Sequence, residues 1–121
     1  MLNKIRISLN FMLSEFDSPD THQVIIHPML LDFLQRLRDR LARPVLVRSG
    51  YRTPSYNRQV KGKSGSYHPQ GMAADIECPG VSSIEIAKEA EAVGFTGIIV
   101  YHNKGIVHLD IRKKPYKRGV V

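Results

Sequence analysis

The chain has 121 residues, of which 42% are hydrophobic and 24% are charged, a composition typical of a globular domain and not of a disordered chain. No apolar run approaches the roughly 20 residues that a membrane-spanning helix needs, so we expect no membrane span. Lysine and arginine outnumber the acidic residues by 18 to 11, and the formal net charge of +7 favours polyanions as partners.

The N-terminal segment and the single cysteine bear on where the protein is expected to act. Residues 1–20 are interrupted by polar and charged side chains, beginning with Asn3 and Lys4, and lack the continuous apolar core of a signal peptide. We therefore expect a protein that is cytoplasmic as synthesised. Cys78 stands alone, which excludes an internal disulfide and a cysteine-rich zinc ribbon and favours a small apolar role over a nucleophilic one.

The first half of the chain predicts a helix, a strand and a short helix. His27 and Pro28 open a helix whose leucines recur at helical spacing up to Leu41, and Pro44 ends it. Residues 44–47 (PVLV) predict a buried strand that leads into the segment SGYR, and Pro54 is placed to start a short helix.

The second half predicts a strand, a helix and a hairpin. Pro69 and Gly71 form a tight turn before a short strand over 72–76, and Ser82 has the spacing of a helix cap. Residues 96–101 and 105–111 predict an antiparallel hairpin joined by HNKG. This order indicates one α+β domain over 1–121, with helices on one face of a small antiparallel sheet, a polar site on the other face and a basic tail over about 113–121.

Two strands of this scheme carry polar residues among apolar ones. On its strand Asp75 shares a face with Ala73, and on the hairpin His108 shares a face with Asp110. A buried acid is costly unless a cation or hydrogen bonds compensate it, so the shared face predicts the floor of a site. Asp75 and His108, together with His68, supply one carboxylate and two imidazoles, which is the donor set of a zinc ion with an open fourth position. Taken alone, His68 is also compatible with a hydrogen-bonding loop residue, and Asp75 with a strand end.

Three segments in order carry a family resemblance: VRSGYRTPSYN, SYHPQGMAADI and GIVHLDIR. They resemble the zinc D-alanyl-D-alanine carboxypeptidase-like peptidases, a group that includes bacterial cell-wall peptidases and phage endolysins and shares its fold with the Hedgehog signalling domain. The pattern Ser-x-His-x-x-Gly-x-Ala-x-Asp is complete here from Ser66 to Asp75. The resemblance implies a Hedgehog/DD-peptidase-like fold, zinc held by His68, Asp75 and His108, and substrate binding by Arg52 and Ser66.

One position departs from the pattern of several members. They carry an acidic general base three residues before the last histidine ligand, where this chain has Gly105. Asp110 and His102 are then the candidates for the base. Asp110 is equally compatible with fixing an imidazole tautomer, and His102 with a solvated turn, so the sequence leaves both assignments open.

The function expected from these features is that of a zinc metallopeptidase. It would hydrolyse a peptide bond of peptidoglycan stem or cross-bridge peptides at a D-amino acid, as a carboxypeptidase or an endopeptidase, with anionic wall polymers as further partners. Release by phage lysis or carriage on a virion would bring it to the cell wall. The alternative is a zinc-containing binding module of the same fold, cell-wall or virion associated, that lacks catalysis. Nucleic acid is not favoured, because the chain shows no helix-turn-helix, zinc-finger or aromatic-rich RNA-binding pattern.

Overall fold

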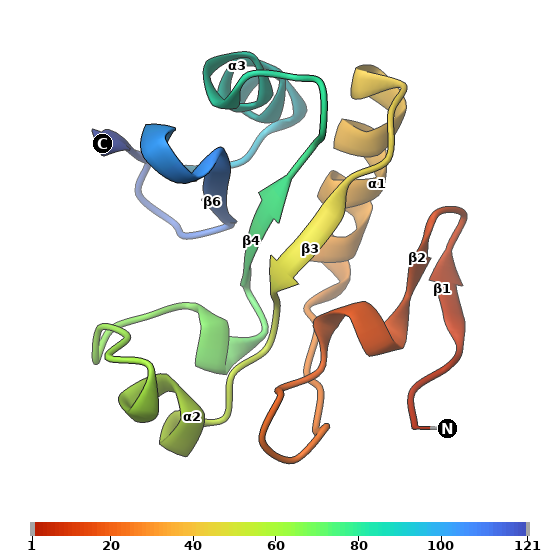
Figure 1. Ribbon diagram of the computed structural model, residues 1–121, viewed down its shortest axis with the longest axis vertical. Helices are drawn as coiled ribbons and strands as arrows, with labels where there is room; N and C mark the ends of the chain where they lie inside the picture. The colour runs from red at the N-terminus through yellow and green to blue at the C-terminus, as the bar shows by residue number, and fades with distance from the viewer. Residues whose placement is uncertain (1, 121) are drawn as a thin grey trace.

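The computed structural model describes residues 2–120 and is an α+β fold (Figure 1). The helices are α1 (Pro28–Leu41), α2 (Pro54–Gln59) and α3 (Ser83–Val93), with 3₁₀ turns at Leu13–Phe16, His68–Gln70 and His102–Lys104. The strands are β1 (Arg6–Ser8), β2 (Phe11–Met12), β3 (Leu46–Ser49), β4 (Ala73–Glu77), β5 (Gly97–Tyr101), β6 (Ile106–Asp110) and β7 (Tyr116–Val120). Across this described part, no helix has the length and apolarity needed to cross a membrane.

The main sheet has five strands in the order β3-β4-β6-β5-β7. The first four pair antiparallel, as predicted, but β7 pairs parallel with β5 and makes the sheet mixed. The segment expected to be a basic tail therefore contains an edge strand. Two further hydrogen bonds tie this segment to Thr96: Tyr116 N donates to Thr96 O at 2.7 Å, and Thr96 Oγ1 donates to Arg112 O.

The two longer helices begin and end where the sequence predicts. The His27 ring caps α1 by accepting from Met29 N at 3.0 Å, and Pro28 occupies its first turn, where no amide hydrogen is needed. Ser82 Oγ accepts from Glu85 N at the start of α3, and Gly94 ends that helix at φ 126°.

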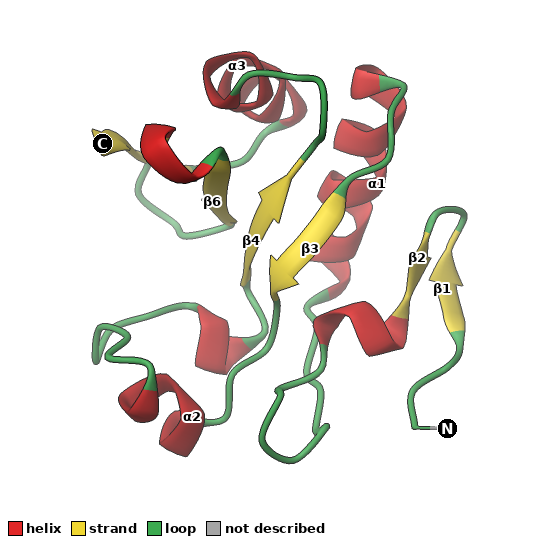
Figure 2. Cartoon of the chain, viewed as in Figure 1, coloured by secondary structure: helices red, strands yellow, loops and turns green. Residues whose placement is uncertain are grey.

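The core fills one face of the sheet. Alternate residues of β4, β6 and β5 are buried there, represented by Ile76, Leu109 and Ile98, in one cluster with Leu34 of α1 and Ile86 of α3. Figure 2 shows α1 alongside β3 and α3 above β4 at the top of the view. The prediction that helices cover one face is confirmed, which leaves the opposite face to the polar residues of the same strands.

Two features differ from the sequence prediction. Leu46 is 40% exposed and β3 is only partly covered, because β3 is an edge strand and not the buried strand that PVLV suggested. The residues before α1 form the hairpin β1–β2 (red in Figure 1), which carries Phe11 into the core beside Phe16. Its strands of three and two residues are too short to give a strand pattern.

Candidate metal centre

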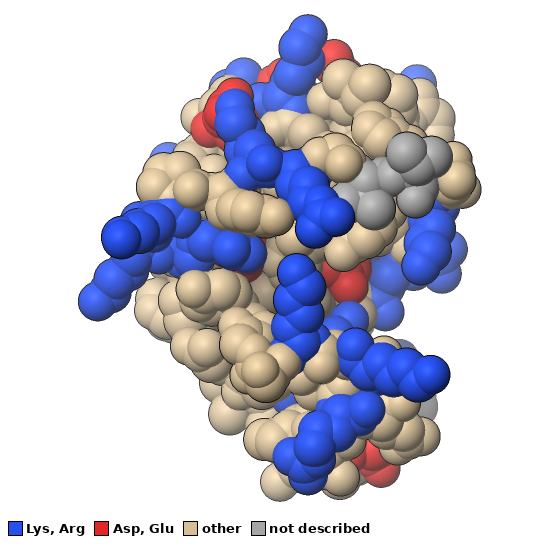
Figure 3. Space-filling view, turned by 90° about the vertical axis from the view of Figure 1, so that its left-hand side faces the viewer, with Lys and Arg blue, Asp and Glu red and all other residues tan. Residues whose placement is uncertain are grey.

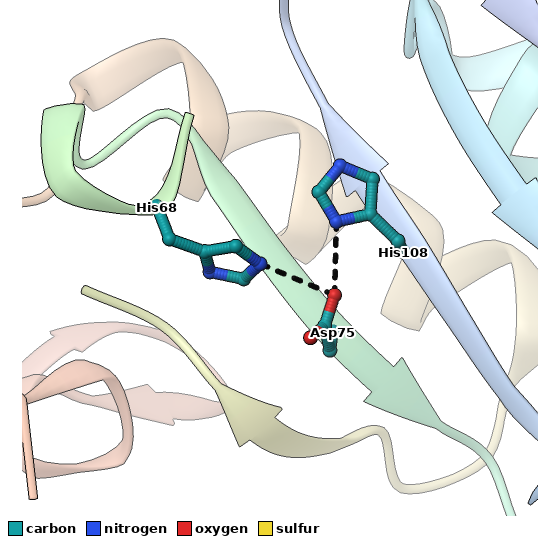
Figure 4. A group of neighbouring side chains, drawn as sticks. All are labelled: His68, Asp75 and His108. Carbon is teal, nitrogen blue, oxygen red and sulfur yellow. Dashed lines mark hydrogen bonds and ion pairs between the residues drawn. The ribbon is translucent and has the colours of Figure 1, made fainter. Parts of the chain in front are cut away.

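Three side chains from separate parts of the chain meet on the polar face of the sheet (Figure 4). Strand pairing places Asp75 of β4 directly opposite His108 of β6, while His68 comes from the 3₁₀ turn just before β4. One ligand atom from each residue lies within 4.8 Å of the other two. The structure thus brings together the three residues that the sequence proposed as metal ligands.

The turn that carries His68 has the geometry that its sequence predicts. Gly71 adopts φ 70°, where a side chain would also run into the backbone of Ile25. Gly71 N donates to His68 O at 3.1 Å, and Ser66 Oγ accepts from His68 N at 3.2 Å. Ser66, expected to bind substrate, lines the cavity and also shapes the turn that presents the ligand.

Each imidazole is oriented by a hydrogen bond on the side away from Asp75. His68 Nδ1 lies 2.7 Å from Gly50 O, a carbonyl that can only accept, so this nitrogen carries the proton. His108 Nε2 lies 2.8 Å from Asp110 Oδ2, which likewise accepts. His68 Nε2 and His108 Nδ1 are left to face Asp75 Oδ1, at 3.3 and 2.9 Å. Such contacts need either a second proton on each ring or a shared metal cation.

The charges in this cluster stabilise one another. Burial pushes the pKa of Asp75 upward, but hydrogen bonds from His108 and His68 outweigh burial and hold that pKa well below its usual value. Burial also acts on His108 by lowering its pKa, but the carboxylates of Asp110 and Asp75 reverse the effect and raise the pKa above that of a free imidazole. The site therefore presents an ionised carboxylate beside two imidazoles, which suits a divalent cation.

The donor geometry fits zinc. Tetrahedral zinc with ligand bonds of about 2.0–2.1 Å places neighbouring donor atoms roughly 3.3 Å apart. The spacing of 3.3 Å between His68 Nε2 and Asp75 Oδ1 matches this value, and the pair His108 Nδ1–Asp75 Oδ1 is slightly closer at 2.9 Å. Two imidazoles and one carboxylate would leave the fourth position of the tetrahedron to water or substrate.

Arg52 lies against the same carboxylate. Its Nη2 donates to Asp75 Oδ2 at 3.2 Å, its Nε to Ser49 Oγ at 3.0 Å and its Nη1 to Asn57 Oδ1 at 3.2 Å. Each guanidinium nitrogen therefore has a partner in the protein. Arg52 neutralises and orients Asp75, and only the remaining hydrogens of Nη1 and Nη2 are left for a ligand.

Neither candidate for the general base has a free group at the centre. Asp110 is fully buried, and its two oxygens accept from His108 and from the backbone and guanidinium of Arg112. His102 lines a different, smaller cavity beside α3, near Gly119 of β7. The structure thus places Asp110 behind the ligand His108 and does not bring His102 to the metal centre.

The centre opens into a cavity of about 1010 Å³ with a basic lining. Its basic residues are Arg52, Lys61, Lys63, Lys104 and Arg112, and Asp75 is the sole acid that residues 2–120 contribute to the lining. Figure 3 shows the side on which β6 and the loop after α2 lie, and lysine and arginine far outnumber acids there. Within the described residues, the two ligand histidines are the only imidazoles that line this cavity.

Sequence reasoning missed the aromatic walls of the cavity. Tyr101 lines it because β5 alternates and places Ile99 opposite His108 on the same face. Burial, with Asp75 adding to the effect, raises the pKa of Tyr101, so its hydroxyl stays protonated at neutral pH. Applying the two-residue alternation to β5, the strand paired with β6, would have identified Tyr101 from the sequence.

Comparison with known proteins decides the family. The family model described as Peptidase M15 matches residues 4–110, which is most of the chain. The chain belongs to the peptidase M15 family. This is the family of zinc D-alanyl-D-alanine carboxypeptidase-like peptidases, so the resemblance drawn from the sequence is confirmed and the protein is placed among metallopeptidases. A comparison with curated proteins gave no match.

Proposed function

We propose that this M15 metallopeptidase hydrolyses a peptide bond in the stem or cross-bridge peptides of peptidoglycan, next to a D-amino acid. The observation that carries the proposal is the His68–Asp75–His108 cluster at the floor of an open cavity in a chain of this family. Zinc held there would supply an acidified water and polarise the scissile carbonyl.

The surrounding side chains have assignable roles. His68 and His108 offer their unprotonated nitrogens to the metal, because Gly50 O and Asp110 hold the protons on the other side. Arg52 donates to Asp75 and keeps it directed at the centre, and the spare hydrogens of Arg52 can donate to a substrate carboxylate or carbonyl. The phenol of Tyr101 is a further donor in reach of a bound peptide, since it lines the same cavity.

The proton of the attacking water needs a route. Among the described residues, the cavity has no carboxylate or imidazole beyond the metal ligands. We assign Asp110 the role of a positioning residue that acts through His108, because its carboxylate is buried and fully used. Solvent in the open cavity then receives the proton.

The same observation favours a second candidate function. A zinc-containing module that binds wall peptides without cleaving them would need the ligands and the basic lining but no base, and Gly105 stands where several members carry one. In both cases the basic lining suits the carboxylates of wall peptides and the anionic wall polymers.

Digestion of purified peptidoglycan separates these functions. Zinc-loaded protein is incubated with the wall, and the released fragments and new amino termini are identified by mass spectrometry, with and without a chelator. Peptidase action gives new termini that the chelator abolishes and that zinc restores. Sedimentation with the wall but no new termini would support the binding module, and neither cleavage nor binding would refute both candidates.

A further inference from the structure

Arg112, the second residue after β6, is attached to the metal centre by a chain of contacts. Its Nε and Nη2 donate to Asp110 Oδ1 and Oδ2 at 2.8 and 2.5 Å. Asp110 Oδ2 also accepts a hydrogen bond from His108 Nε2. The side chain of Arg112 also lines the cavity above the ligands. It therefore belongs to the site, although the sequence assigned no role to this last residue of the segment GIVHLDIR.

The guanidinium of Arg112 makes cation–π contacts with two tyrosine rings. Its Cζ lies 4.9 Å from the ring centroid of Tyr67, the residue before the ligand His68, and 4.9 Å from that of Tyr116 on β7. The N–H groups of a planar guanidinium point outward along its edges, so hydrogen-bond partners lie at the edges and not over the faces. Asp110 occupies one edge, the pair formed by Nε and Nη2.

The other edge, formed by Nη1 and Nη2, has no assigned partner. Nη1 donates to no group among residues 2–120, and in that part of the chain no buried side-chain nitrogen is left without a partner. Nη1 is therefore reached by solvent, and the cavity is the open space that Arg112 lines. This edge presents two parallel N–H groups, the arrangement that binds both oxygens of a carboxylate.

We propose that Arg112 is a substrate-binding residue that takes a carboxylate of the peptide in a slot, the part of the cavity lined by Arg112, Tyr67 and Tyr116. It differs from Arg52, whose three nitrogens are directed to three separate protein groups. The two arginines approach the ligands from different sides, Arg52 through Asp75 and Arg112 through Asp110 and His108. The substrate class is accordingly a peptide with an acidic side chain near the bond that is cut, and this inference rests on the proposed peptidase function.

The slot is rigid before any ligand arrives. Asp110 is fully buried and fixes the guanidinium in plane, and a Cβ on Gly97 would come within 1.9 Å of Asp110 Oδ1, so glycine is needed there to admit the carboxylate. A donor pair held in place in this way loses little entropy on binding. Lysine at position 112 could keep a charge near Asp110 but could not hold two oxygens in parallel.

The test uses two synthetic stem peptides that differ in one side chain, which carries a carboxylate in the first and a carboxamide in the second. The ratio of their kcat/KM values is measured for wild type, Arg112→Lys and the control Lys113→Gln. The control removes one positive charge at the adjacent, exposed position, which does not line the cavity. Wild type and the control should prefer the carboxylate by about tenfold or more, and Arg112→Lys should lose most of that preference.

Thermal unfolding and zinc content establish that each variant is folded and loaded. If Arg112→Lys does not fold, Tyr116→Leu removes one ring of the slot and should reduce the preference in part. An equal loss on both peptides in Arg112→Lys, or a wild type without preference, would overturn the proposal, since Arg112 would then act only through Asp110. If neither peptide is cleaved, the peptidase function fails, and the same ratio is read from calorimetric binding constants of the two peptides for the zinc-loaded protein.

Discussion

Replacing Asp110 by asparagine should weaken zinc binding although Asp110 is not a ligand. The two oxygens of Asp110 each accept two hydrogen bonds: Oδ1 from Arg112 N and Nε, and Oδ2 from His108 Nε2 and Arg112 Nη2. Asparagine keeps one acceptor and puts an NH₂ donor at the other place. Whichever way the asparagine amide is turned, its NH₂ group then faces two N–H donors where an oxygen had accepted from both.

His108 can avoid this contact between two donors by changing its tautomer. If the amide nitrogen faces His108 Nε2, the ring accepts there and carries its proton on Nδ1, the nitrogen that faces Asp75 and the metal. Zinc must then displace that proton, so affinity falls. Loss of a hydrogen bond behind a metal ligand typically costs 10–100-fold in affinity, or about 1.4–2.7 kcal/mol.

Zinc affinity is measured by competition with a chromophoric chelator at pH 7.5, followed by peptide hydrolysis at saturating zinc. Asp110→Asn should raise the Kd for zinc by at least about tenfold and recover most of its turnover once loaded. Asp32→Asn, at an exposed ion pair with Arg36, makes the same chemical change and should alter neither property. A normal Kd for Asp110→Asn with turnover lost at full zinc occupancy would refute this reasoning and make Asp110 the general base.

Three further predictions follow from the same contacts. Gly97→Ala should displace the Asp110 carboxylate, weaken zinc binding and lower the free energy of unfolding, measured by heat or urea, by about 1–3 kcal/mol. Gly65→Ala, which has open space around it, should change the free energy of unfolding by no more than about 0.5 kcal/mol. Equal effects of the two substitutions would contradict the close approach of Gly97 to Asp110. Because the pKa of His108 is raised, its protonation stabilises the metal-free fold below about pH 6.5, and this contribution is lost as pH rises through the raised value. Zinc needs the neutral ring, so the increase in Tm on adding zinc should be larger at pH 8 than at pH 6, and a constant increase would argue against an imidazole ligand. Arg52→Lys should keep the fold and zinc but lower kcat/KM by about tenfold or more, and unfolding of this variant would instead show a structural role.

The order of helices and strands from residue 27 to residue 111 could be predicted because each element has a local signal. Pro28 and Ser82 start helices, Gly94 ends one, and the two-residue alternation around His108 marks a strand. The same alternation put Asp75 and His108 on polar faces, and pairing of β4 with β6 brought those faces together.

The remaining features depend on contacts between distant segments. Strand β7 forms because β5 offers an open edge, and a run of basic residues gives no sign of that pairing. The environment of Asp110 depends on Gly97 of the facing strand and on Arg112, which folds back from beyond the end of β6. His102 was a candidate base because it stands at the hairpin turn, which could have brought its imidazole back over the metal, but the chain turns it toward α3 and away from the metal centre.

Zinc content of the purified protein tests the central claim most directly. Wild type and the variants His68→Ala, Asp75→Ala and His108→Ala are stripped with chelator, incubated with zinc, dialysed and measured by elemental analysis. We predict one zinc per chain in wild type and a clear loss in each variant, since the three ligand atoms lie within 4.8 Å of one another and no other group of three such residues is found in the described part of the chain. Undiminished zinc in His108→Ala, or a wild type that retains none, would contradict the account.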